Sequence, residues 1–408
     1  MKKIIFFTLI LLLLSISVSA QTVELTFWNG FTGPDREYVE GIVAKFNEEH
    51  QDIEVKMEIM PWDSFFQKLL PSLAVGQGPD IAGMGREHLS RFADAGIIAP
   101  IDDFYNDYLA KENLPPSLYE AMRWEDQVYA APMTLATAGF YYNKELFAEA
   151  GLGEEPPENW DQLFEYARKL TKDTTGDGKI DQYGFIFPIK GYLEAWSIVI
   201  WGNNGRVLED GEIKINEAEA VEAIKRLTDA MKEDKISPFV INGVEGDQLF
   251  ASGKAAMYFN GPWAYPQFEN AGLDFGVAAA PKNPDGESIN WAGGTAMVLN
   301  KNSIDKKEAA YKFFEYWNSK ESQIYFSINT GSPPTRTDIP EAEFSQKAVI
   351  NTFSEISEKS RFPLNKEPEF STIISDVIHP ALERILYDEA TAQESLDQAA
   401  EELEKFIE

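Results

Sequence analysis

Acidic residues recur at short intervals in residues 171–185, TKDTTGDGKIDQYGF, and could hold a cation. An EF-hand calcium loop that starts at Asp173 would need oxygen ligands at alternate positions, glycine at the sixth and glutamate at the twelfth. The first, fifth, sixth and ninth positions fit, but Thr175 occupies the third and Gly184 the twelfth, so the closing bidentate ligand is missing. Two interpretations stay open: a glycine-shaped turn without metal, or a structural calcium site formed by Asp173, Thr175, Asp177, Lys179 and Asp181.

The residue patterns of common catalytic centres do not occur in the sequence. His50, His88 and His379 stand far apart, and none belongs to the HExxH motif of zinc hydrolases. A nucleophile elbow, a Walker loop and a GxGxxG motif are also missing, and residues 303–306 fit SxxK without its companion motifs. We therefore expect a protein that is not an enzyme and requires no cofactor. A carboxylate pair for glycoside hydrolysis stays open, because 67 acidic residues offer many pairs and their separation depends on the fold.

Several tryptophans stand beside glycine, proline or polar residues, as in FWNGFTGPD, MPWDSF and NGPWAYP. Rings at strand ends and in turns can face a cleft, and open α/β sheets bind ligands beyond the carboxyl ends of their strands. Flat apolar rings next to amides and carboxylates suit sugars, whose faces carry C–H groups and whose edges carry hydroxyls. Core packing is the alternative for each ring. The candidates for a sugar site are Trp28, Trp62, Trp196, Trp201, Trp263 and Trp291.

The elements that would position these rings alternate between strands and helices. Residues 23–27 and 53–59 alternate as strands, and a helix between them places its apolar residues on one face. These residues are Val39, Ile42, Val43 and Phe46. A second helix from about residue 63 and a short buried strand at 79–85 follow, and this order is typical of a parallel sheet with crossover helices.

A second α/β unit begins near residue 128. It includes a helix capped at Asn159, a helix at 217–233 and a strand at 254–263, and the chain from Lys306 onward is largely helical. No flexible linker separates the two units. We therefore expect the chain to cross between two lobes more than once, so that the joint is a hinge.

Length, charge and the first residues narrow the class of protein. A chain of 408 residues predicts at least two lobes, and a formal net charge of −31 argues against nucleic acid and anionic membrane surfaces as partners. Lys2 and Lys3 precede an apolar run, and residues 18–20 provide a cleavage site, so residues 1–20 are expected to be a signal peptide; an uncleaved membrane anchor is the alternative. The chain has no cysteine for a lipid anchor, so we expect a periplasmic or secreted protein.

Longer segments resemble a known family. LTFWNGFTGPDREYVEGIVAKFNEEHQDIEVKM, GQGPDIAGM, PMTLATAGFYYNKELFAEAGL, LFASGKAAMYFNGPWAYPQFENAGLDFGVAAAPK and WAGGTAMVLNKNSIDKKEAAYKFFEYW resemble extracellular solute-binding proteins of family 1. These are the sugar-binding components of ABC importers, and the similarity extends to maltose-binding proteins. The resemblance implies an α/β, two-lobed periplasmic binding protein fold (type II), whose lobes are joined by a multi-strand hinge. It also implies a sugar ligand, permease subunits as partners and a monomeric protein.

The resemblance also implies boundaries and site residues. The hinge would lie near residues 136–138 and 291–295, which divides the chain into a first lobe of 21–135 plus 296–335 and a second lobe of 136–295 plus 336–408. Trp263 of the NGPW motif corresponds to a ring that stacks on sugar. Ala136 replaces an acidic residue that maltose-binding proteins carry, which argues against maltose itself. The remaining implied ligand-binding residues are Asn29, Asp35, Asp80, Arg86, Thr137, Trp291 and Gly293.

Two functions follow from these observations. The first is an extracytoplasmic receptor that captures a sugar or oligosaccharide between its lobes and delivers it to a membrane permease. The alternative is an exported carbohydrate-active hydrolase with a carboxylate pair.

Overall fold

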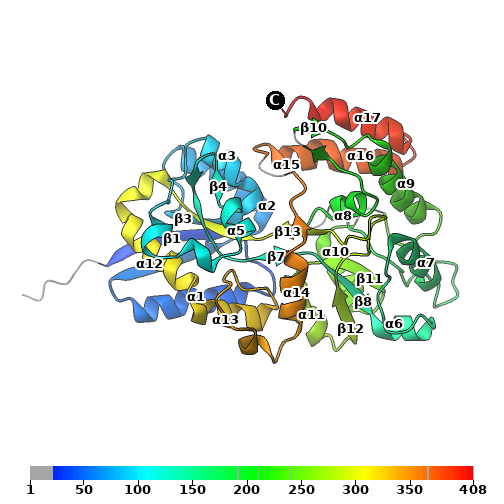
Figure 1. Cartoon of the computed structure of the whole chain (residues 1–408), viewed down its shortest axis with the longest axis horizontal. Helices are drawn as coiled ribbons and strands as arrows, with labels where there is room; N and C mark the ends of the chain where they lie inside the picture. Colours follow the sequence, from blue (N-terminus) through cyan, green and yellow to red (C-terminus); the bar gives the residue numbers. More distant parts are fainter. Residues whose placement is uncertain (1–21, 191–192, 210, 240, 365–366, 408) are drawn as a thin grey trace, which may run out of the picture.

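The computed structural model describes residues 22–190, 193–209, 211–239, 241–364 and 367–407, so the predicted signal peptide lies outside the described residues. Figure 1 shows two bodies side by side, one built mainly from the first third of the chain and the other mainly from the middle and the end. No helix in the described ranges is long and apolar enough to cross a membrane. The fold is a two-lobed α/β fold, as expected from the alternation of strands and helices.

The first lobe is built on a five-stranded sheet in the order β2-β1-β3-β14-β6. β1 (Val23–Asn29), β2 (Ile53–Ile59) and β3 (Ile81–Gly85) are parallel, and β14 (Thr295–Leu299) runs antiparallel between β3 and β6 (Ala130–Pro132). The first crossover helix is α1 (Arg36–Glu49), and it buries the four predicted residues Val39, Ile42, Val43 and Phe46.

The remaining elements of this part of the structure are helices and a separate two-stranded sheet formed by β4 and β5. They are α2 (Trp62–Ala74), η1 (Arg86–His88), α3 (Leu89–Asp94), α4 (Phe104–Asp107), η2 (Lys111–Asn113), α5 (Pro116–Ala121), β4 (Arg123–Trp124), β5 (Gln127–Val128), η4 (Lys301–Lys306), α12 (Lys307–Trp317) and α13 (Lys320–Thr330). One hydrophobic core joins the first sheet to α1, α2 and α12 and includes Phe326 of α13.

The second lobe is built on an antiparallel sheet in the order β11-β8-β12. The strands are β8 (Gly139–Asn143), β11 (Met257–Asn260) and β12 (Phe275–Ala278). Side chains of β8 alternate between two cores, because successive residues of a strand point to opposite faces: Phe140 and Tyr142 pack in one core and Tyr141 in the other. The sheet is therefore covered on both faces.

The other elements of the second lobe come from two separate stretches of the chain. The first stretch has α6 (Lys144–Glu149), α7 (Trp160–Leu170), α8 (Ala195–Trp201), β9 (Leu208–Glu209), β10 (Glu212–Ile213), α9 (Ala218–Lys232), α10 (Gly243–Ala251), η3 (Pro262–Ala264) and α11 (Tyr265–Asn270). The second has η5 (Glu341–Phe344), α14 (Val349–Ser357), α15 (Phe370–Ile373), η6 (Ile374–Ile378), α16 (His379–Leu386) and α17 (Ala392–Leu403). Asn159 caps α7 as predicted, since its side chain accepts a hydrogen bond from the Gln162 backbone N–H.

Three short strands join the two lobes. β13 (Asn290–Gly293) lies between β7 (Ala136–Thr137) and β15 (Ser360–Arg361), and Figure 1 shows β7 and β13 between the two bodies. The resemblance implied a hinge at 136–138 and 291–295, and β7 and β13 lie there. The third strand, β15, was not predicted, because two residues are too few for a periodic signal.

Candidate functional site

The carboxyl ends of the three parallel strands place several predicted residues at one edge of the first sheet. Asn29 ends β1, Trp62 begins α2 just after β2, and Arg86 follows β3. Because the strands are parallel and neighbouring, these three ends meet at the same edge, where open α/β sheets bind their ligands. Asn29 is fully buried, and its Nδ2 has no hydrogen-bond partner in the described part of the chain.

Trp62 forms an aromatic group at this edge. Its ring lies directly over Gly30, where an added Cβ would come within 2.0 Å of the ring. It stacks on Phe66 with centroids 5.7 Å apart and meets the edge of Phe31 at 5.8 Å. Trp62 is half-buried, so one part of its ring packs against the first lobe and another part is exposed and could contact a ligand.

The second lobe and the hinge contribute a pair of tryptophans. Trp263, in the turn after β11, meets Trp291 of β13 at right angles, with centroids 6.4 Å apart and an interplanar angle of 88°. Trp291 is nearly buried, and its Nε1 donates a hydrogen bond to Glu194 Oε2 at 2.6 Å. Trp263 is half-buried. The two rings therefore form a fixed corner with a carboxylate at one end.

Arg86 ties the edge of the first lobe to the hinge and to the second lobe. Its Nη2 donates to the Gly293 carbonyl oxygen at 2.5 Å, and its guanidinium lies over the Phe362 ring, 4.1 Å from the ring centre. Burial lowers the pKa of Arg86 to about 9, although the nearby Glu87 carboxylate acts in the opposite direction. Nε of Arg86 has no hydrogen-bond partner in the described ranges.

Two glutamates from opposite lobes, Glu87 and Glu194, interact electrostatically here. Burial raises the pKa of Glu194 to about 8, and repulsion from Glu87 adds to this shift. Burial likewise raises the pKa of Glu87 to about 7. A carboxyl in this environment can accept hydrogen bonds from a neutral ligand when ionised and donate one when protonated, and its ionised form repels an anionic ligand. Neither residue was predicted, because nothing in the sequence separates them from the other acids.

A further contact joins the lobes beside Arg86. His88 of η1 lies within hydrogen-bond distance of Ser371 of α15, with Nδ1 and Oγ 3.0 Å apart, and its ring lies 3.8 Å from that of Phe66. Between the lobes lies a cavity of only about 30 Å³, which is lined in part by Glu87 and Phe362. The lobes therefore touch at η1 in this structure.

A larger groove, of about 630 Å³, lies on the outer face of the second lobe between α7 and α9. Its charged residues pair with one another, as Lys225 does with Asp229 and Arg168 with Asp234. This groove is a largely charged helix surface, and Trp62, Trp263 and Trp291 do not line it, so we do not assign the site to it.

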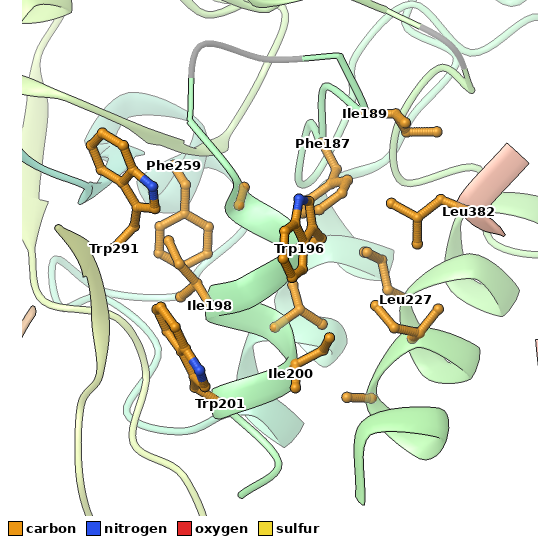
Figure 2. Close-up of a cluster of buried hydrophobic side chains, with 14 of the residues drawn as sticks. Phe187, Ile189, Trp196, Ile198, Ile200, Trp201, Leu227, Phe259, Trp291 and Leu382 are labelled. Atoms are coloured by element: carbon orange, nitrogen blue, oxygen red, sulfur yellow. The ribbon is translucent and has the colours of Figure 1, made fainter. Parts of the chain in front are cut away.

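The structure corrects two predicted site residues. Trp196 is 2% exposed and Trp201 is 4% exposed, and both belong to α8 inside the core of the second lobe. Figure 2 shows Trp196 among Phe187, Leu227 and Leu382 rather than at a surface. All seven residues of the segment AWSIVIW are buried, which is typical of a helix inside a core. The expectation that its two tryptophan rings face a cleft was therefore wrong.

Asp80 and Thr137 have structural partners that occupy their polar atoms. Asp80 precedes β3, at the opposite end from the carboxyl edge, and its carboxylate accepts hydrogen bonds from Thr26, Ser303 and Lys306 at 2.6–2.9 Å. The Thr137 hydroxyl donates to the Trp291 carbonyl oxygen at 2.9 Å and also contacts Ser360 Oγ. Asp80 thus holds the first lobe together, and Thr137 joins the three hinge strands.

The other predicted residues lie near the edge of the first lobe or in the hinge. Trp28 is half-buried on β1, with Lys68 Nζ 4.0 Å from its ring centre. Asp35 directly precedes α1, and burial raises its pKa to about 6. Gly293 lies beneath the Trp291 ring, where an added Cβ would come within 1.8 Å of the ring, so only glycine fits this position.

The acidic loop at 171–185 is organised by its own backbone. Asp173 accepts hydrogen bonds from the N–H groups of Gly176 and Gly178, both at 2.7 Å, and Asp181 accepts from the Thr174 N–H at 2.9 Å. Gly176 and Gly178 have positive φ, which favours glycine. Within the described ranges, no group of three or more His, Cys, Asp or Glu is arranged to hold a metal ion.

The fold and the site together define a two-lobed binding protein with a group of aromatic and acidic side chains at its hinge. The chain belongs to the bacterial extracellular solute-binding proteins, because the model of that family matches residues 41–352. The galactooligosaccharide-binding protein of Bacillus subtilis (strain 168) is 25% identical over 94% of this chain and 89% of its own length. The maltotriose-binding protein of Pyrococcus abyssi (strain GE5 / Orsay) is 24% identical over 90% of this chain and 78% of its own length.

A solved structure shows the same fold. The ABC transporter solute-binding protein from Thermotoga lettingae TMO, bound with alpha-D-tagatose, has a TM-score of 0.85 and 25% identity, and it covers 95% of this chain and 100% of its own. These relatives are solute-binding proteins, and none of their names describes a hydrolase.

Proposed function

We propose that this protein captures a neutral sugar or oligosaccharide between its lobes and delivers it to the permease of an ABC importer. The observation that carries the proposal is the corner of Trp263 and Trp291 with the Glu194 carboxylate at its end. An aromatic face packs against the C–H groups of a sugar ring, while a carboxyl group can exchange hydrogen bonds with its hydroxyls. The galactooligosaccharide and maltotriose named for two relatives, and the tagatose bound to a third, support the same ligand class.

The ligand is expected to carry no anionic group. The negative charge of Glu87 contributes to the raised pKa of Glu194, and an anionic group bound beside these two residues would add a further negative charge.

A thermal-shift screen over mono- and oligosaccharides tests the proposal, with calorimetry on each hit. We expect at least one neutral sugar to raise the melting temperature, because a ligand that binds only the folded state stabilises it by about 2.7 kcal/mol at ~100 times its Kd. Stabilisation by sugar phosphates or uronic acids, without any neutral sugar among the hits, would contradict it.

Turnover separates the receptor from the hydrolase alternative. A receptor leaves the oligosaccharide that it binds unchanged after prolonged incubation, whereas a hydrolase shortens it. Chromatography of the recovered sugar decides between them.

We also propose that the protein acts outside the cytoplasm as a monomer after cleavage near Gln21. The family to which it belongs is extracellular, and residues 18–20 have the small side chains of a cleavage site. Intact-mass analysis of exported protein checks the cleavage, and light scattering checks the oligomeric state. An exported form that retains residues 1–20 would contradict the first part of this proposal.

A further inference from the structure

The turn that carries Trp263 is held by a chain of buried polar groups. The Gly261 N–H donates to Asn260 Oδ1 at 2.8 Å, and the Gly261 carbonyl oxygen accepts from Tyr141 Oη at 2.8 Å. Both polar atoms of this glycine are therefore bound by side chains from the sheet. The Trp263 ring lies directly over Gly261, where an added Cβ would come within 2.1 Å of the ring. A shift of the Gly261 backbone would therefore move the surface on which the ring rests.

Asn260 is itself held by a carboxylate. Asp247 of α10 accepts a hydrogen bond from Asn260 Nδ2 at 2.5 Å and another from Tyr258 Oη at 3.0 Å. Both Asp247 and Asn260 are buried, and α10 is fixed at its start by a capping box between Asn242 and Glu245. Because Asp247 Oδ1 accepts both of these hydrogen bonds, it requires the NH₂ end of the Asn260 amide to point toward it.

The same requirement determines where the oxygen of the Asn260 amide points. With its NH₂ group bound to Asp247, Asn260 turns its oxygen toward the Gly261 N–H, which needs an acceptor. A flipped amide would place an NH₂ group against the N–H and leave the carboxylate without that donor. The buried carboxylate thus selects one of two orientations of the amide, and the selected orientation holds the turn.

We propose that Asp247 is a positioning residue for the sugar site: through Asn260 it holds Gly261 in place and thereby sets the orientation of Trp263 against Trp291. The inference rests on the proposed function, because Trp263 matters only if its ring contacts ligand. It assigns a role to a buried acid that makes no contact with ligand itself. The carboxylate is retained in an apolar core despite its desolvation, which raises the pKa of Asp247 to about 7.

Near-ultraviolet circular dichroism of the ligand-free protein tests the inference without knowledge of the sugar. The signal that depends on Trp263 is first defined as the difference between the wild type and Trp263→Phe. Asp247→Ala is expected to remove most of this signal, whereas Asp247→Asn keeps an acceptor oxygen for Asn260 and Tyr258 and should restore it. In a double-mutant cycle, Asp247→Ala should cause little further change once Trp263 is already Phe.

Controls separate positioning from general stability. Asp103→Ala removes a comparable bond from a tyrosine hydroxyl to a carboxylate in the first lobe, Tyr311 Oη to Asp103 Oδ1 at 2.5 Å, and should leave the Trp263 signal unchanged. Far-ultraviolet spectra confirm folding, and Asn260→Ala replaces Asp247→Ala if the latter does not fold. An unchanged tryptophan signal in folded Asp247→Ala, or a change of the same size in the Trp263→Phe background, would overturn the inference. Because these spectra need no ligand, their outcome is independent of whether the protein binds sugar.

Discussion

The guanidinium carbon of Arg86 lies 4.1 Å from the centre of the Phe362 ring, and this contact joins the edge of the first lobe to the segment that follows the third hinge strand. The neighbouring contact between His88 and Ser371 lies on the same side of the hinge. Both are made between lobes and outside the corner of Trp263 and Trp291. We therefore expect these two contacts to influence the balance between open and closed arrangements.

Phe362→Ala should favour the open arrangement. A cation over an aromatic ring contributes about 0.5–2 kcal/mol, so its loss should shift the equilibrium by roughly 2- to 30-fold. Small-angle scattering of the ligand-free protein is expected to show a larger radius of gyration. Tyr119→Ala, which removes the ring beside Lys111 within the first lobe, should leave the radius unchanged.

Trp263→Ala should weaken binding of any sugar identified by the screen. Truncation of a central, desolvated tryptophan commonly costs ~2 kcal/mol or more, or about 30-fold in affinity. Calorimetry measures this loss, with circular dichroism as the folding control and Trp124→Ala, in the first lobe, as the matched variant. Wild-type affinity in folded Trp263→Ala would place the ligand elsewhere.

The protein should lose stability as the pH rises from about 4.5 to about 8. The folded state raises the pKa of Glu194 from 4.5 to about 8 and that of Glu87 from 4.5 to about 7, so between these values these two groups bind more protons in the folded protein than in the unfolded chain. Under this condition the free energy of unfolding falls with pH. Chemical unfolding at several pH values checks the slope, and Glu194→Gln should make it shallower. A slope of the opposite sign across this interval would refute the assignment.

Asp80→Ala should destabilise the first lobe without affecting sugar affinity. The carboxylate accepts hydrogen bonds from three residues, including an ion pair with Lys306, and hydrogen bonds to charged groups contribute about 1.5–3 kcal/mol. Urea unfolding measures the first effect and calorimetry the second. A loss of sugar affinity without a loss of stability would instead support a role of Asp80 in ligand binding.

The loop at 173–181 should behave as a turn whose stability depends on Asp173. Asp173→Ala removes the acceptor of the Gly176 and Gly178 N–H groups and should lower the melting temperature equally in chelator and in calcium. A wild-type protein that melts higher in calcium than in chelator, with the difference abolished by Asp177→Ala, would instead support the calcium interpretation.

The local elements followed from the sequence because their causes are local. The apolar face of residues 36–49 needs only a period of 3.6, and the cap at Asn159 depends on one side chain and the backbone N–H of Gln162. Together with the family resemblance, this information was sufficient for two α/β lobes and for hinge strands near residues 136 and 291.

Only the tertiary structure decided which residues meet between the lobes. Glu87 and Glu194 are separated by more than a hundred residues and have no distinguishing local pattern, so the effect of Glu87 on the pKa of Glu194 depends on how the lobes are placed. Trp196 and Trp263 are the same residue type, yet one is enclosed by helices and the other lies at a turn beside Trp291. Burial is a property of all the surfaces that converge on a side chain, and most of those surfaces come from distant parts of the chain.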